Sequence, residues 1–149
     1  MAFAPGPVLG LDLGDARIGV AISDPDRHIA VPVGTVQVGR PPGEIQAIAA
    51  LVASRGVTLV VLGEPLSMDG SRGNRAQHAA AFAEVLRSSL DVPVDLQDER
   101  LSTVEGERRL VQAGVESRER RSVIDAVAAQ VILQSWLDAH RGDPPEPAD

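Results

Sequence analysis

The chain has 149 residues, the size of one domain, and contains 44% apolar and 23% charged residues. It has no cysteine, which excludes disulfide scaffolds, thiolate zinc sites and cysteine nucleophiles. The net charge of −7 argues against a protein that coats nucleic acid through a general basic field. No apolar run approaches the roughly 20 residues of a membrane span, and the amino terminus lacks the pattern of a signal peptide. We therefore expect a soluble cytoplasmic protein with no membrane partner.

Taken in chain order, apolar periodicity and turn signals predict strands and helices around one core. The strands cover 8–13, 17–23, 30–38, 58–62 and 92–96, and the first two form a hairpin across Gly14-Asp15. The helices cover 44–54, 74–90, 102–113 and 123–139, and the polar segment 114–122 is expected to be mobile. One domain spans 8–140, between a flexible amino terminus (1–7) and a disordered, acidic, proline-rich tail (141–149).

This order predicts the α/β class. Three meandering antiparallel strands, followed by parallel strands that alternate with helices, give a mixed five-stranded sheet flanked by helices. It is the element order of the ribonuclease H-like fold.

Acidic residues stand at three places where they point to chemistry. Asp12 interrupts a buried central strand, where a carboxylate needs a partner or a metal ion. The alternative is a structural aspartate that caps the nearby turn. Asp98 and Glu99 follow the fifth strand, and alternation allows only one of them to share the side of Asp12. Asp125 shares a helix face with small and apolar residues, although the helix dipole also favours an acid there.

Together these carboxylates predict a site for divalent cations. Oxygen ligands without histidine or cysteine favour Mg²⁺ or Mn²⁺ over zinc. Two such ions suit phosphodiester hydrolysis, because one activates water and the other stabilises the leaving oxygen.

Arginine is the cation of this chain, since all 14 lysine or arginine positions hold arginine, which suits bidentate phosphate contacts. The three aromatic residues are too few for platforms on which bases stack. Segment 100–121 contains six arginines and four glutamates. The candidate nucleic-acid-binding residues are Arg72, Arg75, Arg100, Arg118, Arg120 and Arg121, and solvated surface positions are the alternative. The histidines, at 28, 78 and 140, show no catalytic spacing.

Four segments carry a family resemblance, and they stand in the order LGLDLGDARIGVAISD (9–24), GEPLSMDG (63–70), DERLST (98–103) and IDAVAA (124–129). The chain resembles the YqgF family, also called RuvX, whose members are described as pre-16S rRNA nucleases and as Holliday junction resolvases. The resemblance implies a ribonuclease H-like fold related to the RuvC resolvases. It places the family's acidic residues on Asp12, on Glu99 (with Asp98 as the alternative) and on Asp125. Glu64 is a further candidate ligand, because the family often has an apolar residue there whereas RuvC-type resolvases carry an acid.

The resulting prediction is a metal-dependent nuclease with two Mg²⁺ or Mn²⁺ ions on Asp12, Glu99 and Asp125. Its expected substrate is the 5′ end of pre-16S rRNA during ribosome biogenesis, on a pre-ribosomal particle, and the alternative substrate is a branched DNA junction. Two other classes stay open: a non-catalytic ribosome-assembly factor, and an ATP-binding module of the actin and hexokinase type, suggested by Asp12-x-Gly14 followed by Gly19. Monomer and homodimer are both compatible with the sequence.

Overall fold

The computed structural model describes residues 5–65, 69, 73–99 and 117–141, with the side chains of 117–122 left out. Five strands form one sheet in the order β3-β2-β1-β4-β5. The central strand β1 (Val8–Leu13) pairs antiparallel with β2 (Arg17–Ser23), which pairs antiparallel with the edge strand β3 (Ala30–Gln37). On its other side, β4 (Leu59–Glu64) and β5 (Val94–Asp98) add in parallel. The predicted mixed sheet and its first hairpin are confirmed.

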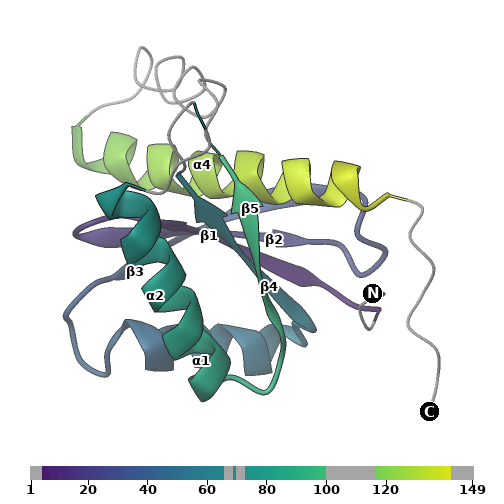
Figure 1. The fold of residues 1–149 in the computed structure, drawn as a ribbon, viewed down its shortest axis with the longest axis horizontal. Helices are drawn as coiled ribbons and strands as arrows, with labels where there is room; N and C mark the ends of the chain where they lie inside the picture. Colours follow the sequence, from purple (N-terminus) through teal and green to yellow (C-terminus); the bar gives the residue numbers. More distant parts are fainter. Residues whose placement is uncertain (1–4, 66–68, 70–72, 100–116, 142–149) are drawn as a thin grey trace.

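Helices cover both faces of this sheet (Figure 1). The long helix α4 (Ser117–Ala139) lies across one face and contacts every strand, whereas α1 (Glu44–Arg55) and α2 (Asn74–Ser89) pack on the other. The strands therefore contribute side chains to two hydrophobic cores, one on each face of the sheet. Alternate residues of β1 and β4 contribute to the core under α1 and α2, namely Leu9, Leu11, Val60 and Leu62. The intervening residues Val8, Leu59 and Val61 pack with α4.

Close packing of α4 depends on small residues on both sides of its interface with the sheet. Ala128 and Ala129 of α4 are fully buried. A Cβ atom added to Gly10 of β1 would lie 2.7 Å from the Cβ of Leu133, so no larger side chain fits there. Ala129 and Leu133 are four residues apart and lie on the same face of α4, where both contact Gly10. This spacing explains why sequence periodicity identified the helix.

The predicted strands 58–62 and 92–96 are wrong at their carboxyl ends. Parallel pairing of β4 with β5 continues through Gly63 and Glu64, which pair with Gln97 and Asp98. Gly63 therefore does not end its strand, because the neighbouring strand satisfies the backbone there. Asp98 is consequently the last residue of β5 and not part of the following turn.

The predicted start of the last helix at 123 is also wrong. The helix begins at Ser117, so Arg118, Arg120 and Arg121 belong to its first turns and not to an irregular segment. The polar run has no apolar periodicity, but arginine and glutamate are good helix formers and can extend a helix that is packed further along. The predicted helix 102–113 and residues 142–149 of the predicted tail 141–149 lie outside the described residues.

The amino-terminal segment joins the domain before β1 begins. The backbone oxygen of Gly6 accepts a hydrogen bond from Arg27 Nε at 2.9 Å, and that of Pro7 accepts one from the Thr58 amide at 2.9 Å. Of the segment predicted to be flexible, these two residues are therefore held against the sheet. Among the described helices, none has the length and apolarity to cross a membrane.

Candidate functional site

The site is centred on Asp12, which is 4% exposed on the central strand. Val8 and Gly10, at alternate positions of the same strand, pack against α4. Because side chains alternate along a strand, Asp12 lies on this same face. Burial and central position agree with the expectation from the sequence.

Glycines flank Asp12 on both neighbouring strands. Gly19 of β2 is its cross-strand partner, and Leu11 pairs with Leu62 of β4, so the next register position brings Gly63 beside Asp12. Neither neighbour has a side chain to cover the carboxylate of Asp12. Groups from outside the sheet fill both spaces.

Glu99 approaches from the side of β5. Its backbone N–H donates a hydrogen bond to the oxygen of Glu64 at 3.0 Å, which continues the β4–β5 pairing by one residue. A Cβ atom built on Gly63 would lie 3.0 Å from Oε1 of Glu99 and 2.7 Å from Cδ1 of Ile132 in α4. The carboxylate of Glu99 therefore lies over Gly63 on the α4 face, next to Asp12.

Asp125 approaches from the opposite side, on α4. Its backbone oxygen would lie 1.9 Å from a Cβ atom on Gly19, so the helix contacts the sheet directly at the residue beside Asp12. Its side-chain Oδ2 accepts a hydrogen bond from Nε of Arg17 at 2.8 Å, and both side chains are about a quarter exposed, at 22% and 25%. The fold thus brings Asp12, Glu99 and Asp125 to one face at one edge of the sheet.

Glu64 and Asp98 lie on the other face. Val60 and Leu62, at alternate positions before Glu64, belong to the core under α1 and α2, and Val94 and Leu96 stand in the same relation to Asp98. Alternation therefore directs both acidic side chains away from Asp12. Glu64 is buried there, at 7% exposed.

The donor chemistry of the three residues on the α4 face suits a hard cation such as Mg²⁺ or Mn²⁺. In the described part of the chain, however, no three acidic or histidine side chains converge closely enough to hold one metal ion. The Asp125 carboxylate is paired with the Arg17 guanidinium at 2.8 Å.

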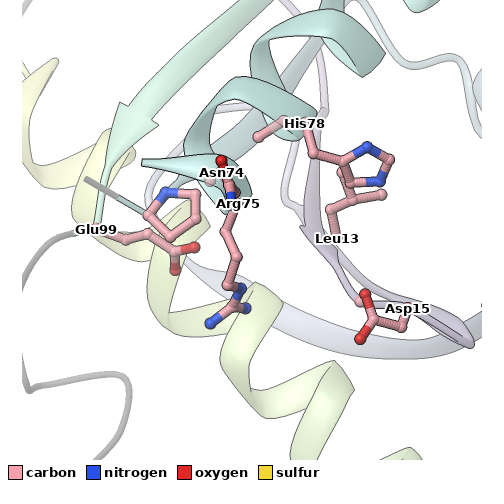
Figure 2. Close-up of a pocket in the computed structure, with 10 residues that line it drawn as sticks. Leu13, Asp15, Asn74, Arg75, His78 and Glu99 are labelled. Carbon is pink, nitrogen blue, oxygen red and sulfur yellow. The ribbon is translucent and has the colours of Figure 1, made fainter. Parts of the chain in front are cut away.

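A pocket of about 260 Å³ opens at the same edge, between the β1–β2 turn and the start of α2 (Figure 2). Glu99 and Gly63 form part of its wall, so the pocket adjoins the carboxylates. Its other polar lining residues are Asp15, Asn74, Arg75 and His78. Of these, sequence reasoning had assigned a function to Arg75 alone. The short spacing of Asn74, Arg75 and His78 in the first two turns of a helix was the available signal.

The structure describes the remaining candidate arginines only in part. Arg72 and Arg100 lie outside the described residues. Arg118, Arg120 and Arg121 lie on the first turns of α4, the helix that carries Asp125, and their backbone alone is described.

The strand order, the two-sided helix cover and the acid on the central strand define a ribonuclease H-like fold of the resolvase type. The fold resembles RuvC from T. thermophilus in complex with a Holliday junction, with a TM-score of 0.54, 15% identity and coverage of 92% of this chain and 96% of RuvC. It also resembles the fowlpox virus Holliday junction resolvase, with a TM-score of 0.53, 10% identity and coverage of 89% and 99%.

Sequence similarity identifies the family within that class. The sequence model of the RuvX family, described as "Holliday junction resolvase", matches residues 6–139, and the chain belongs to this family of nucleases. A relative from Myxococcus xanthus named "Putative pre-16S rRNA nuclease" is 51% identical over 93% of this chain and 90% of its own. A relative of the same name from Chloroflexus aurantiacus is 46% identical over 92% and 90%.

Proposed function

We propose that this protein is a divalent-metal-dependent nuclease that processes the 5′ end of pre-16S rRNA in the cytoplasm. The observation that carries the proposal is that Asp12, Glu99 and Asp125 lie on one face at one end of the sheet, beside an open pocket. The names of the relatives, at 51% and 46% identity, support the choice of RNA substrate.

Asp12, Glu99 and Asp125 would hold the metal ions in this proposal. When bound, such ions supply an activated water and stabilise the leaving oxygen. The chain's own contribution is positional. Gly19 and Gly63 leave room for the outer two acids beside Asp12, and Arg17 holds the Asp125 side chain towards the sheet by its 2.8 Å hydrogen bond.

The test is a cleavage assay with Mn²⁺ or Mg²⁺ on an RNA that spans the mature 5′ end of 16S rRNA, with a four-way DNA junction beside it. We expect the wild type to cut the RNA at the mature end and Asp12→Asn to lose cleavage while its circular dichroism is unchanged. Cleavage by Asp12→Asn at the wild-type rate would show that the assigned site is wrong. Absence of any cleavage, with tight binding of Mg-ATP or of pre-ribosomal particles, would favour the two non-nuclease classes.

Resolution of branched DNA is the second candidate function, and the description of the matched family favours it. A symmetric junction requires a two-fold dimer, because two strands must be cut in equivalent positions. Cleavage of the junction and not of the RNA, by a species that sediments as a dimer, would support this candidate.

The arginines near the amino end of α4 are proposed to hold the substrate backbone. Replacing Arg118, Arg120 and Arg121 by glutamine should weaken binding across unrelated sequences and reduce the salt dependence by about one unit of slope for each phosphate that is no longer bound. A filter-binding titration over a salt series measures this slope. An unchanged slope would assign the three arginines to solubility alone.

A further inference from the structure

The pocket beside Glu99 contains cationic and polar groups that no described interaction uses. Arg75 and His78 are exposed side chains on the first two turns of α2. Within the described residues, neither side chain forms a hydrogen bond or an ion pair. Arg87, further along the same helix, differs in this respect, because it binds Glu84 and the backbone oxygen of Val94. Arg75 and His78 are therefore available to a ligand.

Figure 2 shows how these side chains are arranged. Arg75 extends from α2 with Glu99 on one side of it and Asp15 on the other, and the ring of His78 stands on the side of Leu13. The pocket thus presents cationic and neutral donors on the α2 wall and carboxylates at its edges. Its volume of about 260 Å³ is near the lower limit of about 300–1,000 Å³ for small-molecule sites, which suits one phosphate and its sugar better than a large cofactor.

We propose that this pocket is a subsite for the backbone phosphate adjacent to the scissile one, with Arg75 and His78 as its hydrogen-bond donors. The inference rests on the proposed nuclease function and assigns a positioning role within it. Glu99 lines the pocket and also lies over Gly63 beside Asp12, so a strand held here lies beside the carboxylates.

Charge balance gives the physical reason for such a subsite. The chain carries a net charge of −7, and bound metal ions would offset only the carboxylates that hold them, so a polyanionic strand still needs cationic donors beside the site. Arginine contributes a planar pair of donors that matches phosphate geometry, and its contact fixes both position and orientation. Histidine adds a shorter donor three residues along the same helix face.

The experiment combines variants of the protein with a modified RNA. A set of substrates that span the mature 5′ end of 16S rRNA each carries one uncharged methylphosphonate, at successive positions around the cleavage site. KM and kcat are measured with Mn²⁺ for the wild type, Arg75→Gln and His78→Gln. Arg55→Gln and His28→Gln are matched controls, because these exposed side chains lie at the opposite ends of the strands from the pocket. Arg55 precedes β4, and His28 lies between β2 and β3.

We expect one methylphosphonate, next to the scissile position, to raise the KM of the wild type about tenfold, the effect of losing one hydrogen bond to a charged group. Arg75→Gln should raise the KM for unmodified RNA by a similar factor, and the same methylphosphonate should then have no further effect. His78→Gln should raise the KM less and should reduce the effect of this methylphosphonate only in part. In both control variants, the methylphosphonate should raise the KM as much as it does in the wild type.

Three outcomes would overturn the subsite, and they are distinguishable from one another. If the wild type cuts the RNA through Asp12 but Arg75→Gln responds to every methylphosphonate as the wild type does, the subsite is refuted and the nuclease function stands. If Arg75→Gln lowers kcat equally at all positions without changing KM, a structural role replaces the subsite. If the wild type cuts no RNA and no DNA junction, the proposed function fails, and the subsite fails with it.

Discussion

Gly19→Ala tests the contact that positions Asp125, and its effect follows from the packing of α4. The added methyl group would lie 1.9 Å from the backbone oxygen of Asp125 and 2.5 Å from its carbonyl carbon. Ordinary contact begins at 3.4 Å, so the helix must move away from the sheet by about 1.5 Å at this point. No side-chain rotation relieves the clash, because the opposing atoms belong to the helix backbone.

The cost should reach the upper end of the range for overpacked cores, about 3 kcal/mol. Lifting the helix also separates Ala128 and Ala129 from the sheet, which removes buried contacts. For a domain near 150 residues, this corresponds to a fall in Tm of about 6–12 °C. The same displacement moves the Asp125 carboxylate away from Arg17, so the 2.8 Å ion pair should weaken.

Thermal and urea unfolding of Gly19→Ala measure the stability change. Gly56→Ala is the control, because its φ of 65° strains an alanine but nothing lies within 4 Å of the new methyl group, so about 1–2 kcal/mol is expected. Adding Arg17→Gln to Gly19→Ala should cost less than Arg17→Gln costs in the wild type, since residues in contact are coupled. An unchanged Tm for Gly19→Ala, together with full additivity, would refute the assigned contact between α4 and β2.

The remaining predictions concern the carboxylates. Millimolar Mg²⁺ or Mn²⁺ should raise the Tm of the wild type through binding linkage, and Asp12→Asn should reduce that shift; equal shifts would place the ions elsewhere. Arg17→Gln should cost at most about 1 kcal/mol and enlarge the metal-induced Tm shift, because the cation that competes for Asp125 is gone; an unchanged shift in calorimetry would exclude that competition. The N–H of Ile29 holds the pKa of Asp24 below its ordinary value, so this stabilisation is complete above the ordinary aspartate pKa and is lost as the pH falls through the lowered one. Asp24→Asn should therefore flatten the acid limb of a Tm-against-pH curve, and an unchanged limb would contradict this.

Local patterns in the sequence were sufficient for most of the fold. The turn at Gly14 predicted the β1–β2 hairpin, and the apolar run 8–13, broken only by Gly10 and Asp12, predicted a central strand with a buried acid. Periodicity identified the α4 face that carries Asp125, Ala128 and Ala129. Each of these predictions rests on a pattern within one element or one hairpin. Where a neighbouring element decided the outcome, as in the extension of β4 through Gly63, the local pattern was misleading.

The amino-acid sequence by itself determined which residues alternate with one another, and hence that Asp98 and Glu99 point to opposite sides of the sheet. The tertiary structure decided which side holds Asp12, because that depends on which helix packs on which face. It placed Glu99 with Asp12 and directed Glu64 and Asp98 towards α1 and α2. It also formed the pocket that joins His78 to the site, from residues of β1, β4 and α2 that are distant in the chain. Contacts between distant segments depend on how whole elements pack, and periodicity within a single element carries no information about that packing.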